Sequence, residues 1–246
     1  IRYAYDRYDE INDLYKNGYP EGAKTGWATF DEHLTFYDSF LTVITGIPSH
    51  GKSNFLDNLM LRLAVKNGWK FGVFSPENGK VEIHFQRLAE ILIGKPFLPN
   101  YGNRMSKLEL DKALEWINAN IFFIQPDNEE FSLSNILDVA SYLVTKHGIK
   151  GFIIDPWNTI THEYQDLTET EYTKDILNKL TFFERNHGLH LFLVAHPAKM
   201  KKKKDSSQYD IPTLYDISGS ANWYNKAELG ITIYRDFGSD FGTTKQ

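Results

Sequence analysis

The sequence predicts an α/β fold in which a twisted, mostly parallel sheet is flanked by helices. Short runs of β-branched or aromatic residues alternate with longer segments that carry apolar residues at helical spacing, which is the pattern of successive βαβ units. The expected strands lie at 41–45, 71–74, 121–124, 151–154, 190–195 and 230–234. The expected helices lie at 52–66, 81–93, 108–118, 133–147 and 169–186.

The composition is that of an ordinary globular protein. The chain has 246 residues, of which 41% are apolar and 24% are charged. With 27 basic and 32 acidic residues the net charge is −5, so positive charge for a nucleic acid must be gathered locally. There is no long apolar run and no signal peptide, which argues against a membrane protein. The absence of cysteine suits a cytoplasmic protein, either bacterial or from a phage in its host.

The first 20 residues form a distinct segment. Tyr5, Tyr8, Ile11 and Leu14 follow a weak helical repeat, and Gly18 and Pro20 then interrupt the chain. We expect residues 1–20 to be a linker arm for subunit contact, with a surface helix packed on its own domain as the alternative. Residues 21–246 then form the main domain. Because the chain starts with isoleucine, we expect a fragment of a longer polypeptide.

A phosphate-binding loop follows the first expected strand. Residues 46–53 fit the pattern G-x-x-x-x-G-K-[ST] at every fixed position, and a helix follows. Its backbone N–H groups are expected to surround phosphate oxygens, Lys52 to reach the β and γ phosphates from a solvent-facing position, and Ser53 to bind Mg²⁺. The substrate is ATP or another nucleoside triphosphate. The expected nucleotide-binding residues are Gly46, Ile47, Pro48, Ser49, His50, Gly51, Lys52, Ser53 and Asn54.

Two carboxylates extend this prediction. Asp155 ends the apolar strand 151–154, as a Walker B acid does, and we expect it to place Mg²⁺ together with Ser53. The alternative is a turn aspartate before Pro156. Glu77 follows the strand 71–74, at the carboxyl edge beside the P-loop strand, where it could polarise the attacking water. Its alternative role is a first-turn acid at a helix N-terminus.

Five short motifs resemble the hexameric replicative helicases of the DnaB type, above all the helicase half of phage primase–helicases and the Twinkle helicase. They lie between about residues 25 and 234. The motifs are Thr25-Gly26-Trp27 with Phe30-Asp31 and Leu34, Phe74-Ser75-Pro76-Glu77, Leu193-Val194-Ala195-His196, the turn Ser218-Gly219-Ser220-Ala221, and Ala227-Glu228.

This resemblance implies a RecA-like P-loop NTPase that hydrolyses ATP with Mg²⁺ and moves on single-stranded DNA as a homo-oligomer, most often a hexameric ring. It makes Glu77 the water-activating base and His196 the residue that senses the γ-phosphate. Glu228 stands where the family has aspartate. The family's arginine finger is expected beyond Gln246, and we do not assign that role to Arg235. A primase domain on the same polypeptide would precede this fragment.

Two loops are expected over the carboxyl edge of the sheet, facing DNA. One spans 157–168, and the other spans 199–216 and contains a lysine cluster. Lysines there can pair with phosphates of a single strand, although a cluster of this kind is also typical of a solvated loop. The expected DNA-binding residues are Lys199, Lys201, Lys202, Lys203 and Lys204.

Two alternatives remain. One is another RecA-like ATPase, such as a recombinase or a KaiC-like protein, which shares the P-loop, the acid and the glutamate, whereas the Ser218–Ala221 turn and the strand ends argue against it. The other is a ring subunit that binds nucleotide and DNA but has little turnover when isolated.

Overall fold

The computed structural model describes residues 3–76, 79–125, 132–161, 167–198 and 209–236. Within these ranges the chain forms a six-stranded sheet in the order β3-β2-β4-β5-β1-β6. Every neighbouring pair is parallel, so the predicted α/β fold class is confirmed. The strands are β1 (Leu41–Gly46), β2 (Phe71–Phe74), β3 (Ile121–Phe123), β4 (Gly151–Ile154), β5 (His190–Val194) and β6 (Leu229–Ile233).

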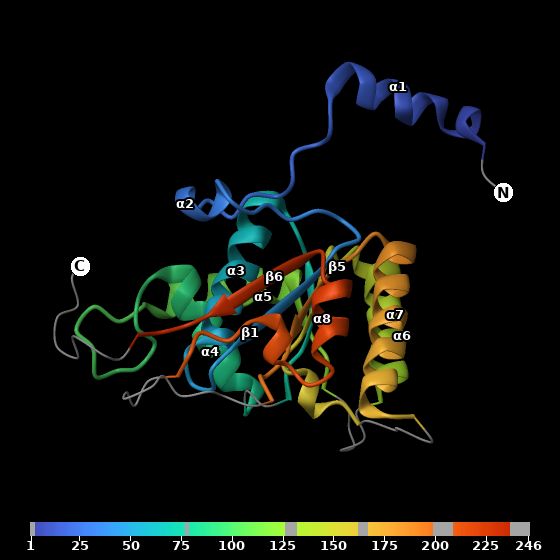
Figure 1. The fold of residues 1–246 in the computed structure, drawn as a ribbon. Helices are drawn as coiled ribbons and strands as arrows, with labels where there is room; N and C mark the ends of the chain where they lie inside the picture. Colours follow the sequence, from blue (N-terminus) through green and yellow to red (C-terminus); the bar gives the residue numbers. More distant parts are fainter. Residues whose placement is uncertain (1–2, 77–78, 126–131, 162–166, 199–208, 237–246) are drawn as a thin grey trace.

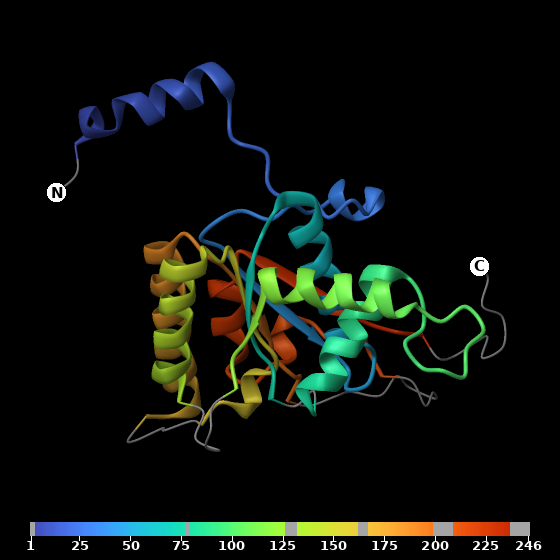
Figure 2. The same cartoon turned by 180° about the vertical axis from the view of Figure 1, so that it is seen from behind.

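Helices cover both faces of the sheet, because alternate residues of the central strands point into two separate apolar cores. Val43 and Leu191 belong to one core, whereas Ile44 and Phe192 belong to the other. The first core is completed by α6 (Leu133–His147), α7 (Glu169–His187) and α8 (Ser220–Lys226). The second is completed by α3 (Lys52–Asn67), α4 (Val81–Ile93) and α5 (Lys107–Asn120). Figures 1 and 2 show α6 and α7 side by side at one end of the molecule.

Local capping explains why the predicted helices begin and end where they do. Ser106 and Glu109 form a capping box at the start of α5, and Thr168 and Glu171 form another at the start of α7. At the other ends, α3, α4, α6 and α7 are each followed by a glycine in the left-handed conformation. The helix bounds expected from the sequence are therefore confirmed to within a few residues.

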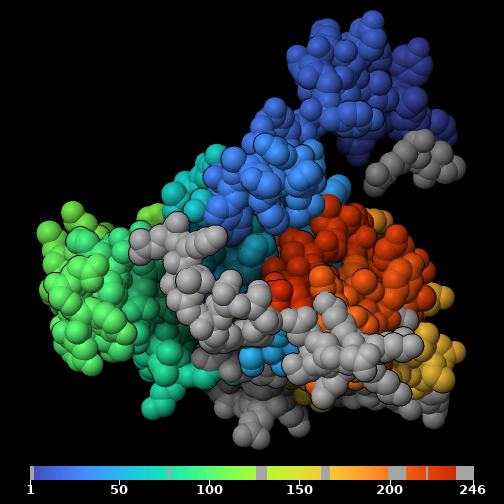
Figure 3. All heavy atoms as spheres, turned by 60° about the vertical axis from the view of Figure 1, so that its left-hand side comes forward, coloured from blue at the N-terminus to red at the C-terminus, as the bar shows by residue number. Residues whose placement is uncertain are grey.

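The N-terminal segment stands apart from the domain. It contains η1 (Ala4–Arg7) and α1 (Tyr8–Asn17), neither of which has a buried residue. Figures 1 and 3 show this segment projecting from the main body. Seven apolar or aromatic side chains of residues 3–20 are exposed: Tyr3, Tyr5, Tyr8, Ile11, Leu14, Tyr15 and Tyr19. The apolar surface of α1 is therefore not buried against the domain.

Three features differ from the sequence prediction. The Ser218–Ala221 motif is not only a turn, because Gly219 starts the helix α8, whose Trp223 is fully buried. A short helix α2 (Ala28–Asp31) was also not predicted. Third, β2 is not beside the P-loop strand β1, since β4 and β5 lie between them. None of the helices in the described ranges is both long and apolar enough to cross a lipid bilayer.

Candidate nucleotide-binding site

A cavity of about 450 Å³ opens at the carboxyl ends of β1, β4 and β5. Since parallel strands all end at the same edge of the sheet, the loops that follow them meet there. The cavity is lined by Pro48, Ser49, Gly51, Lys52, Ser53, Asn54, Asp155 and His196. The structure thus brings together the phosphate loop, the predicted metal-binding acid and the predicted sensor histidine.

The backbone of the phosphate loop has the conformation that an anion site needs. Ser49 has a φ of 65° and Gly51 a φ of 95°, which turns successive peptide groups in different directions. Helix α3 begins immediately afterwards at Lys52, so its positive end lies at the cavity. Gly46 is required by close packing, because a Cβ there would lie 2.2 Å from the carbonyl oxygen of Ile233 on β6.

Lys52 does not face solvent, and the expectation that it would is wrong. Only 5% of the residue is exposed. Its Nζ donates hydrogen bonds to the carbonyl oxygens of Gly46 and Ile47, at 2.9 and 3.1 Å. A buried ammonium is costly without acceptors, so the loop folds its own carbonyls around it. The lysine is thereby held inside the cavity lining before any phosphate arrives.

Asp155 and Ser53 both line the cavity, although they come from different elements. Asp155 follows β4 and is 6% exposed, and its backbone N–H donates to the carbonyl of Phe74 at 2.9 Å. Ser53 is the second residue of α3. A hydroxyl and a carboxylate are oxygen ligands of the kind that Mg²⁺ prefers when phosphate and water complete its shell. The two residues therefore fit the predicted Mg²⁺ site, and their role as ligands stays a prediction.

His196 reaches the cavity because β5 pairs with the P-loop strand. The Thr45 hydroxyl donates to the carbonyl of Ala195 at 2.9 Å, and Ala195 N–H donates to Ile44 at 3.0 Å. The His196 backbone N–H donates to Asn158 Oδ1 at 3.4 Å. Burial, and secondarily the charge of Lys52, lower the pKa of the His196 imidazole. Its Nδ1 is buried and has no hydrogen-bond partner among the described residues.

Gly46, Ile47 and His50 do not line the cavity, although the other predicted nucleotide-binding residues do. His50 turns toward the segment that follows β6, where its Nδ1 accepts the backbone N–H of Arg235 at 2.9 Å. Its ring centroid lies 5.4 Å from that of Tyr234. Burial lowers the pKa of His50, and the charges of Lys52 and Arg235 lower it further. Sequence reasoning missed this contact, because the position is variable in the loop pattern and gives no signal.

Some predicted site residues lie outside the described ranges. These are the proposed base Glu77 and the lysine cluster Lys199, Lys201, Lys202, Lys203 and Lys204. The ends of the second predicted DNA-facing loop are described. There Ala198 N–H donates to Asp216 at 2.8 Å, and Pro197 pairs with Ile217.

Two other motifs have clear structural roles. The Asp31 carboxylate accepts from the backbone and hydroxyl of Thr25 and from Gly26 N–H, all at 2.7 Å. Trp27 then stacks on Phe55 of α3, with 5.6 Å between centroids. At the other end of the domain, Glu228 Oε2 accepts the N–H of Leu41 at 2.9 Å. The longer glutamate therefore anchors the start of the P-loop strand.

Comparison with known proteins agrees with this arrangement. The model of the DnaB-like helicase C terminal domain matches residues 22–245. The "Twinkle homolog protein, chloroplastic/mitochondrial" of Arabidopsis thaliana is 37% identical over 239 residues, which is 94% of this chain and 33% of that protein. The "Probable replicative DNA helicase" of Trieres chinensis is 24% identical over 230 residues, covering 90% of this chain and 50% of that protein. The chain thus spans a third to a half of these relatives.

Solved structures show the same fold. One of them, described as an ATPase domain, superposes with a TM-score of 0.73 at 18% identity, covering 94% of this chain and 81% of that one. A DnaB-like replicative helicase, described together with its interactions with primase, gives a TM-score of 0.74 at 20% identity over 94% of this chain and 57% of that one. The sheet order, the phosphate loop and the sequence match lead to one conclusion: this chain belongs to the family of the DnaB-like helicase C terminal domain.

Proposed function

We propose that this chain is the motor domain of a replicative DNA helicase. It hydrolyses ATP or another nucleoside triphosphate with Mg²⁺ and uses the free energy to move along single-stranded DNA. The observation that carries the proposal is the cavity shared by the phosphate loop, Asp155 and His196. Membership of the DnaB-like helicase family supports the helicase activity.

Each residue has a separate task in this proposal. Lys52 and the loop N–H groups of 49–51 bind the phosphates, and Ser53 and Asp155 hold the metal ion. Bound Mg²⁺ supplies charge that offsets the negative phosphate oxygens. Glu77 takes a proton from the attacking water. His196, whose Nδ1 has no partner among the described residues, can donate a hydrogen bond to a γ-phosphate oxygen, so the loop that follows β5 responds to whether the γ-phosphate is bound.

Assembly and partners are part of the same proposal. The relative from Trieres chinensis is named a probable replicative DNA helicase, and one solved replicative helicase was described with primase. We propose a homo-oligomeric ring, with hexamer as the expected size, in which residues 1–20 contact the neighbouring subunit. The exposed apolar face of α1 supports this, because it buries no residue in its own domain. Single-stranded DNA binds through the loops after β4 and β5, and a primase domain on the same polypeptide is the expected further partner.

A cytoplasmic setting, in a bacterium or in the host of a phage, belongs to the proposal as well. The Arabidopsis relative is named chloroplastic/mitochondrial, and that name describes the relative. Either setting supplies nucleoside triphosphates and Mg²⁺.

The experiment that tests the proposed function compares unwinding with strand exchange. The purified chain is incubated with ATP, Mg²⁺ and a forked duplex that carries a single-stranded tail, and strand release is measured. A matched reaction offers a single strand and a homologous duplex. Release of the displaced strand only with hydrolysable ATP supports the helicase. Exchange without unwinding would instead indicate a recombinase-like ATPase. Turnover that rises with protein concentration, together with the particle mass, reports whether a ring is required.

A further inference from the structure

A buried ionic cluster joins the two helices that flank the proposed chemistry. Asp57 of α3 accepts a hydrogen bond from His84 Nε2 of α4 through Oδ1, at 2.8 Å. Its Oδ2 lies 2.6 Å from the guanidinium Nε of Arg87, one turn further along α4. The residues Asp57 and His84 are 5% and 2% exposed. The His84 ring also packs edge-on against Phe123 of β3, with 4.7 Å between centroids.

The His84–Asp57 contact is a hydrogen bond, whereas Asp57 Oδ2 and Arg87 Nε form an ion pair without hydrogen-bond geometry. A carboxylate that is removed from water needs its partners at short distance, and it is left uncompensated when one is lost. His84 and Arg87 are three residues apart on one helix, so both reach the same carboxylate. The cluster therefore fixes how far α4 is rotated and shifted along α3.

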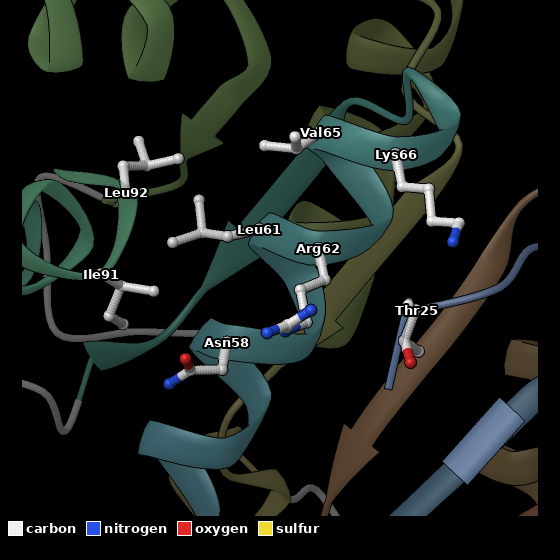
Figure 4. A pocket seen from close by; sticks show the side chains of 9 residues that line it. Thr25, Asn58, Leu61, Arg62, Val65, Lys66, Ile91 and Leu92 are labelled. Atoms are coloured by element: carbon white, nitrogen blue, oxygen red, sulfur yellow. The ribbon is translucent and has the colours of Figure 1, made fainter. Parts of the chain in front are cut away.

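The rest of the contact between these helices is less specific. Beyond the cluster a pocket of about 310 Å³ separates the second half of α3 from the end of α4. Figure 4 shows Leu61 of α3 facing Ile91 and Leu92 of α4 across this pocket. Apolar side chains across a hollow resist sliding weakly, because their contacts have no direction. Helix α4 is held by apolar packing, with Leu88 and Ala89 buried in the second core, and Asp57 and its two partners add polar contacts to α3.

The two helices connect the cluster to the site. Helix α3 begins at Lys52, and Asp57 follows it by about one and a half turns. Helix α4 begins at Val81, four residues after Glu77 in the chain. We propose that Asp57, His84 and Arg87 form a positioning cluster that holds α4 in register with the P-loop helix and thereby sets the place from which Glu77 acts on water. This inference rests on the proposed function, in which Glu77 is the base.

A double-mutant cycle in ATP hydrolysis tests the inference. The full chain is compared with Asp57→Asn, Glu77→Gln and the double variant, at saturating single-stranded DNA. Asp57→Asn is expected to lower kcat on the order of tenfold, since small misplacements of a catalytic group are costly. The KM for ATP should change by less than about twofold, because the phosphate loop itself is intact. In the Glu77→Gln background the same substitution should cause no further loss.

Two controls separate positioning from general destabilisation. Leu143→Ala removes a buried side chain of α6 on the opposite face of the sheet, so it should lower Tm without changing kcat of the folded protein. If Asp57→Asn does not fold, His84→Gln and His84→Leu replace it. The Gln amide can still donate to Asp57 and should retain activity, whereas Leu cannot and should lower kcat.

The outcomes are distinct. An equal loss from Asp57→Asn in both backgrounds, or an unchanged kcat, overturns the positioning cluster and leaves the proposed function standing. Full activity of Glu77→Gln removes the base assignment, and with it the cluster's proposed role. If Asp57→Asn lowers kcat only when Glu77 is present, the result supports both the positioning cluster and the proposed function.

Discussion

The imidazole Nδ1 of His50 accepts the backbone N–H of Arg235 at 2.9 Å. This bond requires an unprotonated Nδ1, in agreement with the lowered pKa that burial and the nearby charges of Lys52 and Arg235 give His50. Together with the close approach of Gly46 to Ile233, it attaches the phosphate loop at two points to the edge strand β6 and the residues after it. Lys52 follows His50 by two residues, so these attachments hold the loop whose carbonyls surround its ammonium.

Replacing Lys52 with alanine should abolish nucleotide-dependent activity without unfolding the domain. The loss in kcat/KM should be on the order of 10²-fold or more, because a preorganised charge at the phosphates is removed. Since Lys52 also donates to two loop carbonyls, the free energy of unfolding should change by about 1–2 kcal/mol. Steady-state ATPase assays and thermal unfolding measure the two effects. Lys112→Ala, on the exposed surface of α5, is the matched control. Unchanged hydrolysis in Lys52→Ala would remove the nucleotide site.

Substitutions of the two predicted carboxylates, Glu77 and Asp155, should affect different steps. Glu77→Gln should bind ATP and Mg²⁺ normally but hydrolyse about 10²- to 10⁴-fold more slowly, since the amide cannot accept the proton. Asp155→Asn should instead raise the Mg²⁺ concentration needed for half-maximal rate. Nucleotide binding and magnesium titrations of the rate distinguish them. Glu82→Gln, another acid near the start of α4, should behave as the parent. Normal turnover by Glu77→Gln would show that the base lies elsewhere.

The lysine cluster should determine the salt dependence of DNA binding. For single strands the slope of log affinity against log salt is about −0.7 per phosphate neutralised. Replacing three lysines with serine, at Lys201, Lys202 and Lys203, should therefore make this slope less negative by about two. ATP affinity should hardly change, while DNA-stimulated hydrolysis should fall. Replacing Lys107 and Lys112 of α5 with Ser serves as a charge control. A slope equal to that of the parent would place the DNA path along 157–168 instead.

Glu184 should make stability depend on pH. Its two carboxylate oxygens are buried without a hydrogen-bond partner among the described residues. Burial, and then the charge of Glu228, raise its pKa from 4.5 to about 8, whereas Arg185 acts in the opposite sense. The folded state therefore holds a proton that the unfolded chain has released between these values, so stability is lost as pH rises from about 4.5 to about 8.

The matching variant is Glu184→Gln, which cannot ionise. The difference in unfolding free energy between variant and parent should grow by more than about 1 kcal/mol from pH 5 to pH 8, since each pKa unit is worth about 1.4 kcal/mol. Urea unfolding at several pH values measures it. His190, whose pKa burial lowers to about 4, titrates in both proteins and cancels in the comparison. A difference independent of pH would mean that Glu184 is ionised in the fold.

The sequence was sufficient for features with a local origin. Each strand is a short apolar run closed by turn residues, and each long helix carries caps, so their bounds were predictable. The helix α8 was not, because its seven residues are held by tertiary contacts: Trp223 is buried and its indole N–H donates to Ser218 at 2.6 Å. A short helix of this kind has no repeat to recognise.

In the site, too, residues with a local sequence signal were predictable and tertiary features were not. Lys52 and Ser53 were identifiable from the fixed loop pattern and Asp155 from its place after an apolar strand, and the structure places all three in one cavity. The burial of Lys52 was not foreseeable, since it depends on how the loop carbonyls turn. The separation of β2 from β1 was also missed, because alternating strands and helices predict a parallel sheet but leave the order of its strands open.

The strand order has a consequence for motion. Strands β4 and β5 are hydrogen-bonded on both edges, whereas β3 and β6 each lack one neighbour in the described sheet. Backbone amides in such central strands exchange with solvent only when the whole domain opens, while border strands open at lower free energy. Asp155 and His196 thus follow strands that belong to the most slowly exchanging part of the molecule. The residues proposed to hold the metal ion and to contact the γ-phosphate are therefore attached to strands that open last.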